Sequence, residues 1–515
     1  MPNARWLALL LLAALVGGSL AATSAYACYL RSAGYRATCA AYLAGALALP
    51  AEIRRVVPRS LQTRQFDGVR VFLPDRRGVA LDCDAALLIR QPTPSDPFAY
   101  ELELSGGKCE ISARTWLRGD YRQIVESGLR PGFAPDGPRR VTFGGMELAF
   151  ARDAFRAVLS DASGAVTFDS PTVGHAAVFC HQFNGHRSRE PVSLMATFSP
   201  RADGVRIDRL ELAVPRLPLA IVGLADLLRS DLRTGEFAGR LDYAESGPVA
   251  VLTARGIVTG LQLGEALAPW FPRPVRGRCG EIELEELRIE DRTPVRLRFR
   301  GVVSDLVLGD LLAPFGLENL AGQTTLRVRE ARLSALGIER LIVSGRCARA
   351  SLADFSRRMG LGAMSGDLVL DLEDLTIEDN RIVSLDAVAH VAPPDDGLDF
   401  IEGTLLRELV RRALGVTLPD VLPERIEYTQ LGVRLQVRDE RLFVFGTHGD
   451  REKTILTVRL LGREVGLLHE PAQPFDLRPS LDELRRRAAE FVESRYAEFR
   501  ARRELRAPSS PTSQP

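Results

Sequence analysis

The phrase Gly322-Gln-Thr-Thr-Leu326 decides the fold of this chain, because related phrases recur at a nearly constant spacing. A glycine that opens a short alternating run also occurs at Gly239, Gly280 and Gly366, at intervals of 41, 42 and 44 residues. A leucine-rich phrase precedes three of these glycines, as Leu261-Gln-Leu-Gly-Glu-Ala-Leu-Ala-Pro-Trp270, Leu306-Val-Leu-Gly-Asp-Leu-Leu-Ala-Pro-Phe315 and the looser Leu352-Ala-Asp-Phe355. Such a fixed period is typical of a repeat architecture.

Each repeat is predicted to hold a short helix, a turn and two or three strands with one apolar face. In the run 295–300, Val295, Leu297 and Phe299 alternate with three arginines, so the apolar and basic side chains lie on opposite faces of a strand. Leu326 and Leu370 lie in the strands of neighbouring repeats. Because one repeat cannot bury such a face alone, these five side chains must face a shared core or an apolar ligand.

Residues 6–30 form a run of 25 residues without a charged side chain. As a helix this run would be ~37 Å long, enough to cross the ~30 Å apolar core of a bilayer. A cleaved signal peptide is an alternative, because Ala25-Tyr-Ala27 resembles a cleavage site, and a lipoprotein signal ending at Cys28 is another. We expect an uncleaved transmembrane anchor, since a signal peptide has an apolar region of only about 7–15 residues.

Composition and pattern divide the rest of the chain into segments of different character. They are a juxtamembrane segment over 31–65 with a helix over 34–55, an N-terminal β domain over 66–200 with a helix over 116–128, the repeat β array over 201–390, a C-terminal β cap over 391–470 with a helix over 403–414, an amphipathic helix over 480–506 and a disordered tail over 507–515. The chain is therefore predicted to be mainly β with short helices.

Two cysteines of the N-terminal β domain are candidates for a disulfide. Cys83 and Cys109 lie in alternating runs, 78–90 and 99–112, joined by the Pro-, Ser- and Asp-rich residues 91–97. Folded about that turn, the two side chains could face each other and form a cross-strand disulfide. The alternative is two unpaired, small apolar residues.

Residue types that carry catalysis or metal binding form no recognisable motif. The 67 basic and 66 acidic residues give a net charge of +1, which argues against a nucleic-acid partner. His175, Cys180, His181 and His186 lie close in sequence, but their spacing matches no standard zinc pattern. A nucleophile elbow, a phosphate-binding loop and a dinucleotide fingerprint are absent from the sequence. We therefore expect no enzyme, no metal and no cofactor.

The single N-terminal apolar run, the leucine-rich phrases before glycine-initiated strands and a strand block over 434–461 together resemble the AsmA-like superfamily of bacterial envelope proteins, with its TamB- and YdbH-type members. The similarity covers about residues 205–468 and the anchor. It implies a single-pass inner-membrane protein with most of its chain in the periplasm, built as an elongated antiparallel β-sheet that curls into a trough with an apolar concave face. Longer members are thought to span a periplasm alone, so at 515 residues a complete bridge is not implied.

A sheet with one apolar face must close on itself, pack on helices or other sheets, or present that face to an apolar ligand. The first hypothesis is that the chain binds or conducts phospholipid or another lipid along the trough, for lipid transport between membranes or outer-membrane maintenance. The second is an envelope scaffold or assembly factor for outer-membrane proteins, with a protein partner and no lipid transport. A metal-dependent enzyme is a distant third.

Overall fold

The computed structural model describes most of the chain between residues 3 and 476. The described ranges are 3–47, 50–60, 62–72, 78–90, 100–112, 139–152, 155–170, 173–201, 204–222, 232–246, 249–267, 274–290, 293–307, 309–310, 322–334, 337–353, 356, 363–391, 399–414, 423–449, 453–460 and 462–476. The helices expected over 116–128 and 480–506 and the tail over 507–515 lie outside them. The fold is mainly β, as expected, and contains few helices.

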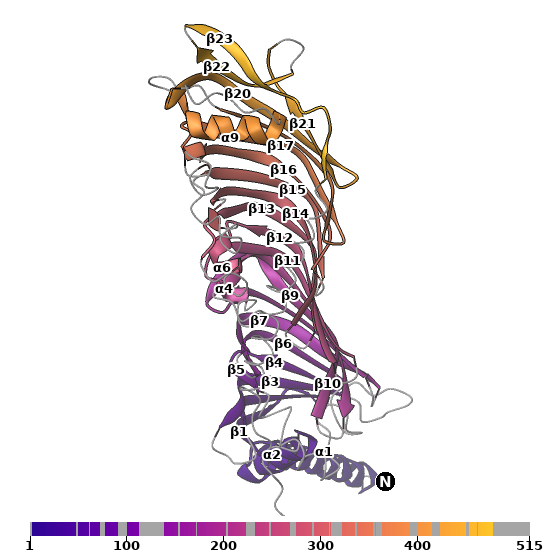
Figure 1. The fold of residues 1–515 in the computed structure, drawn as a ribbon. Coiled ribbons are helices and arrows are strands. Elements are labelled where there is room, and N and C mark those ends of the chain that lie inside the picture. Colours follow the sequence, from indigo (N-terminus) through magenta and orange to yellow (C-terminus); the bar gives the residue numbers. More distant parts are fainter. Residues whose placement is uncertain are drawn as a thin grey trace, which may run out of the picture. The chain divides into compact units, whose positions relative to one another are not determined.

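The chain divides into two compact units. Unit 1 comprises Met1–Arg229, Phe237–Ala254 and Ile289–Thr293, and unit 2 comprises Ser230–Glu236, Arg255–Arg288 and Pro294–Pro515. Each unit is built mainly from antiparallel hairpins whose strands lie side by side (Figure 1).

Two helices begin unit 1 and lie beside its first strand (Figure 1). They are α1 (Asn3–Leu30) and α2 (Ala33–Leu47), and the strand is β1 (Ala51–Pro58). The Ser32 hydroxyl caps α2 by accepting a hydrogen bond of 3.1 Å from the Tyr35 amide. The helix was expected over 34–55 but ends at Leu47. Pro50 disfavours its continuation, and Ile53 and Val56 are instead buried as residues of β1.

No helix within the described part of the chain is long and apolar enough to cross a membrane. Side chains of α1 are described from residue 16 onward.

The strands of unit 1 form a mixed sheet. They are β1, β2 (Thr63–Phe72), β3 (Val79–Arg90), β4 (Tyr100–Ser105), β5 (Lys108–Ser112), β6 (Arg140–Arg152), β7 (Phe155–Ser170), β8 (Val173–Phe183), β9 (His186–Arg201) and β10 (Gly204–Pro218), followed by the short helix α4 (Leu219–Val222). The strands β11 (Glu236–Ser246) and β12 (Val249–Thr259) come next and extend across the division between the units. Consecutive strands pair antiparallel from β1 to β4 and again from β6 to β10, and the junction between these two runs is different.

That junction corrects the expectation of a wholly antiparallel sheet. β4 and β5 both pair antiparallel with β3 but parallel with β6. Gly106 and Gly107 separate β4 from β5 at φ +65° and +96°, and a Cβ on Gly107 would lie 1.9 Å from the Asp82 carbonyl oxygen. The long connection over 113–139 supplies the dozen or more residues that a parallel crossover requires.

Gly239 lies in β11 of unit 1, whereas the other three patterned glycines, Gly280, Gly322 and Gly366, lie in unit 2. Its strands are β13 (Arg278–Glu290), β14 (Thr293–Val307), β15 (Gln323–Ser334), β16 (Gly337–Ser351), β17 (Asp367–Glu378), β18 (Arg381–Val391), β19 (Asp399–Glu402), β20 (Arg425–Arg438), β21 (Arg441–Gly446), β22 (Thr454–Leu460), β23 (Arg463–His469) and β24 (Phe475–Asp476), with the helices α6 (Leu263–Leu267) and α9 (Gly403–Leu414). From β14 to β18 each strand pairs antiparallel with the next, and β18 then pairs with β20. The repeat is thus one long hairpin, with two strands.

Gly366 shows why a glycine opens a repeat. Its φ is +114°, a conformation that side chains disfavour, and a Cβ there would lie 2.5 Å from the Tyr428 hydroxyl and 2.9 Å from Val391. The strand β17 begins at the next residue, so the glycine allows the backbone to enter β17 close to the Tyr428 side chain of β20.

The helix expected over 403–414 is confirmed as α9. Leu405, Leu406 and Val410 of this helix are 2% exposed or less and pack against Ile426 and Val458. Its other side carries an ion pair of 2.6 Å between Arg411 and Glu408. The helix therefore closes an apolar core with β19, β20 and β22 at one end of unit 2.

Candidate functional site

Strand register in unit 2 aligns apolar side chains into rows that run across the strands. Residues paired on antiparallel neighbours point to the same side of a sheet. One row crosses seven strands from β14 to β21, and its members are Val303, Leu326, Gly345, Leu372, Ala387, Leu435 and Val444. The next row crosses from β15 to β21, and its members are Val328, Val343, Leu375, Leu385, Val437 and Leu442. We call the side of the sheet that carries these rows the apolar face of unit 2.

The side chains singled out from sequence lie on this face. Leu297 pairs with Leu333 and Phe299 with Ala331. Leu326 belongs to the first row, and Leu370 lies between Cys347 and Ala389 in a further row. Val295 shares the alternation of Leu297 and Phe299, and all five side chains are half-buried.

Burial on the apolar face separates its small members from its large ones. Val328, Val343 and Ala331 form a cluster and are only 7%, 5% and 1% exposed. Phe299, Leu326, Leu341 and Leu372 pack around that cluster and stay half-buried. Within the described residues, then, the small side chains are covered by the large ones, and the large ones keep part of their apolar surface open.

The helices α6 and α9 contact the margins of this face. Leu263 of α6 packs with Val275, Cys279 and Leu306 at the β13–β14 side. The α9 core includes Leu368 and Val391, at the ends of β17 and β18. Among the described residues, neither helix is part of the central cluster around Val343.

The opposite face of the same strands is charged and cross-linked by ion pairs. Each pair joins neighbouring strands or strands one apart. They are Arg300–Glu283 at 2.7 Å, Arg298–Glu286 at 3.8 Å, Arg340–Glu330 at 3.4 Å, Arg346–Asp371 at 3.5 Å, Arg434–Asp386 at 2.7 Å and Arg329–Asp374. Partly exposed pairs of this kind contribute little each, but they mark this face as the solvated one.

Asp386 is a carboxylate of the charged face that accepts three side-chain hydrogen bonds. It accepts hydrogen bonds from Arg434 Nε at 2.9 Å and Nη2 at 2.7 Å, and from Gln436 Nε2 at 2.9 Å. The hydrogen bonds from Arg434 lower the pKa of Asp386 below its usual value, against the opposing effect of desolvation. Arg276 lowers the pKa of Asp310 in the same way through a bidentate contact.

The histidine and cysteine residues proposed as metal ligands are not brought together. Cys180 is 1% exposed, whereas the neighbouring His181 on β8 is exposed, as expected for side chains on opposite faces. His175 Nε2 lies 3.1 Å from Asp169, and its Nδ1 lies 3.2 Å from the Thr197 hydroxyl. Within the described part of the chain, no group of three or more potential ligands could hold a metal ion.

Cys83 and Cys109 are both free thiols on paired strands. Cys109 lies opposite Leu81, and Cys83 therefore occupies the diagonal position. Diagonal neighbours are about 7–8 Å apart, and a disulfide requires Cα atoms within about 4.4–6.8 Å. The disulfide stays a prediction that would need the two strands to shift. Burial raises the pKa of the Cys109 thiol to about 12.

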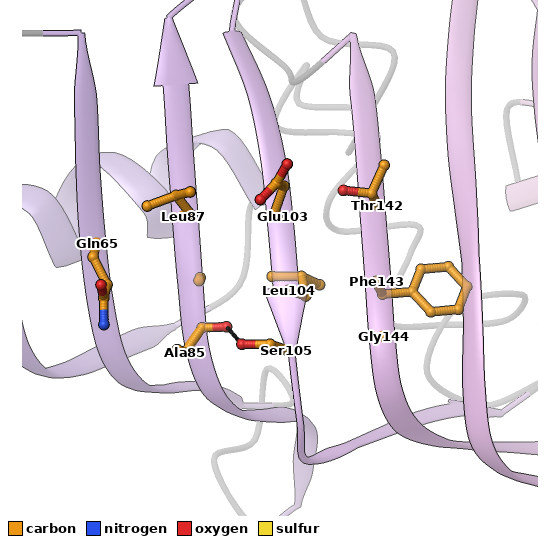
Figure 2. A pocket seen from close by; sticks show the side chains of 10 residues that line it. Gln65, Ala85, Leu87, Glu103, Leu104, Ser105, Thr142, Phe143 and Gly144 are labelled. Atoms are coloured by element: carbon orange, nitrogen blue, oxygen red, sulfur yellow. Dashed lines mark hydrogen bonds between the residues drawn. The ribbon is translucent and has the colours of Figure 1, made fainter. Parts of the chain in front are cut away.

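A shallow depression of about 400 Å3 lies on the sheet of unit 1 (Figure 2). Gln65, Leu87, Glu103 and Thr142 form a row across β2, β3, β4 and β6 along it. Below them, the Ser105 hydroxyl donates a hydrogen bond of 3.3 Å to the Ala85 carbonyl. Glu103 is the one carboxylate among the residues that line the depression.

No family model matches this chain, and neither a curated protein nor a solved structure matches it.

Several residues of the apolar face were not identified from sequence. The central ones are Leu341, Val343, Leu372, Leu375 and Leu435. Leu372, Leu375 and Leu435 alternate with polar residues, so the face they share could be detected, whereas Leu341 and Val343 lie in the continuous apolar run 341–343, which does not alternate. The residues that each pairs with on the next strand could not be detected. Register shifts between Val328 and Glu330, and between Val343 and Gly345, change which residues pair, and a bulge of this kind leaves little trace in sequence.

Proposed function

We propose that this chain binds the acyl chains of phospholipid or another lipid along the apolar face of unit 2. The observation that carries the proposal is the row from Val303 to Val444, in which seven paired strands present apolar residues while the reverse side carries interstrand ion pairs. Exposed contiguous apolar surface marks an interaction site in a soluble domain. Leu326 and Leu372 are partly exposed beside the buried cluster around Val343, so an acyl chain that lies across the rows could cover their exposed apolar surface.

The length of the row suits such a ligand. Seven strands at a spacing of ~4.8 Å span ~29 Å, close to the ~30 Å thickness of a bilayer core. One acyl chain covers half of that core, so the row is long enough for a whole chain. Each methylene buried on the face contributes roughly 0.8 kcal/mol, which makes such binding favourable without any polar contact.

The proposal includes a location in the cell, the inner membrane, which rests on the uncharged run near the N-terminus. The uncharged run over 6–30 would anchor the chain in the inner membrane as a single span, with the two units in the periplasm. The resemblance to AsmA-like envelope proteins supports this arrangement, and with it a trough-like sheet that contributes to lipid transport between membranes or to outer-membrane maintenance. A protein partner on the same face is the competing outcome.

The proposal is tested by photo-crosslinking. The full chain would be purified in a mild detergent, loaded with a phospholipid that carries a diazirine on its acyl chain, irradiated and digested. We expect crosslinks on peptides of β15 to β18, at Leu326, Leu341, Leu370 or Leu372. Crosslinks at the exposed, opposite-facing Thr325 and Arg327 at equal yield, or none on these strands, would reject the proposal.

A further inference from the structure

Six arginines lie between residues 31 and 64, in the segment that runs from the end of α1 to β2. We call them the arginine collar, and they are Arg31, Arg36, Arg54, Arg55, Arg59 and Arg64. All are exposed except Arg64, which is half-buried. Within the described residues, no carboxylate oxygen lies within 4.0 Å of any collar nitrogen. These six cations are therefore not neutralised by ion pairs within the described chain.

Some basic residues elsewhere in the same unit are paired. Arg70 lies 3.3 Å from Asp82, Lys108 lies 3.1 Å from Glu147, and Arg240 pairs with Glu211. Residues 31–72 contain seven basic and two acidic residues. The acidic ones are Glu52, which is exposed, and Asp67, which accepts a hydrogen bond from Gln65 Nε2 at 2.6 Å. The collar is thus a local excess of positive charge in a chain that is nearly neutral as a whole.

Members of the collar adjoin an apolar cluster that includes the last residue of α1. Leu30, the last residue of α1, is buried with Tyr35, Ile53 and Val56. The Arg64 guanidinium lies over the Tyr35 ring at 5.7 Å from its centroid. Arg36 Nη1 donates a hydrogen bond of 3.0 Å to the Arg54 carbonyl, which ties α2 to β1. Cationic groups and apolar side chains therefore meet beside the end of the proposed membrane anchor.

We propose that the arginine collar binds the phosphate groups of anionic phospholipids at the surface of the membrane that holds α1. This inference rests on the proposed anchor and lipid binding, and it names the lipid class. A guanidinium presents several N–H donors in a plane that matches phosphate oxygens, and clustered basic residues next to a membrane segment favour anionic headgroups.

The test uses the full chain in a neutral detergent. It would be titrated with short-chain phosphatidylglycerol, with short-chain phosphatidylcholine and with inorganic phosphate. We expect phosphatidylglycerol to bind at least about tenfold more tightly than phosphatidylcholine, at roughly fivefold per engaged arginine. Raising the salt to 1 M should remove the preference, because the screening length falls to about 3 Å.

A triple variant locates the effect. Arg31→Gln, Arg36→Gln and Arg55→Gln together should weaken phosphatidylglycerol binding by up to about a hundredfold. The matched control is Arg140→Gln, Arg187→Gln and Arg189→Gln, three exposed arginines of unit 1 outside the collar, and it should bind as the unmodified chain does. Both variants must show the same thermal unfolding, so that a folding defect is separated from a binding one.

Three results would overturn the inference. They are equal affinity for the two lipids, an equal loss in the control, and inorganic phosphate binding as tightly as phosphatidylglycerol, which would mark a site for the free anion. The proposed function is judged separately. If acyl crosslinks form on β15 to β18 while the collar shows no preference, lipid binding by unit 2 stands and the collar inference fails.

Discussion

The bond between Asp386 and Arg434 shows how single side chains can fix which residues lie on each face of the sheet. Arg434 alternates with Val433 and Leu435 on β20, so its bond to Asp386 on β18 fixes the charged side of both strands. A slip of one residue would turn the whole apolar row to the other face and break this bond. Ion pairs that are weak individually can in this way specify register.

The Asp386 contact predicts a pH dependence of stability. The folded pKa of Asp386 lies below its ordinary value, so the ionised group stabilises unit 2 at neutral pH, and this contribution is lost as the pH falls through the folded pKa. We expect Asp386→Asn to lower the free energy of unfolding by about 1 kcal/mol at pH 7, a value reduced for partial exposure. The difference from the unmodified chain should shrink below about pH 4.

Urea unfolding at pH 7 and at pH 3.5 measures the difference in the free energy of unfolding between Asp386→Asn and the unmodified chain. Glu464→Gln is the control, because Glu464 is exposed on β23 and has no ion pair among the described residues. A loss in Asp386→Asn that is the same at both pH values would show that the carboxylate charge is not the source.

At the scale of elements, α9 is the best-packed helix of unit 2. Leu406 is 1% exposed in the core that α9 shares with β19, β20 and β22. Leu406→Ala should destabilise unit 2 by about 2–5 kcal/mol, the usual cost of a large-to-small change in a core. Arg411→Ala on the exposed side of the same helix should change stability by no more than about 0.5 kcal/mol. Thermal unfolding followed by circular dichroism would detect the difference, and equal effects would contradict the packing of α9.

Element identity was largely predictable from sequence, and pairing was not. Strict alternation located β3, β14, β20 and β22, and the amphipathic phrase over 403–414 located α9. Residues 51–55 were expected to be the end of a helix, because Ile53 fits a helical stripe with Tyr42 and Leu43 as well as it fits a strand. Only contact with β2 decides between the two, and contact is not visible in a local pattern.

At the scale of the whole molecule, the candidate site depends on many strands at once. Val295, Leu297, Phe299, Leu326 and Leu370 could be selected from sequence because each alternates with charged neighbours. That they join Leu341, Leu372 and Leu435 in common rows depends on register, and therefore on bulges that only the structure gives. The arginine collar was overlooked for a similar reason, since its members come from two helix ends and two strands.

The central claim is that the apolar face of unit 2 is an open lipid-binding surface and not a closed core. Leu297→Glu, Leu326→Glu and Leu370→Glu, made one at a time, test it directly by thermal unfolding and by mass spectrometry of the lipid that co-purifies with the full chain. Thr325→Glu is the matched control, because Thr325 is exposed, adjacent to Leu326 and paired with Arg346. A charge in a packed core costs several kcal/mol, whereas on an open face it reaches solvent. We predict that each leucine variant unfolds nearly as the unmodified chain does but retains less lipid, and that Thr325→Glu retains it in full. Loss of the cooperative unfolding transition in all three leucine variants would contradict the account and make this face a core.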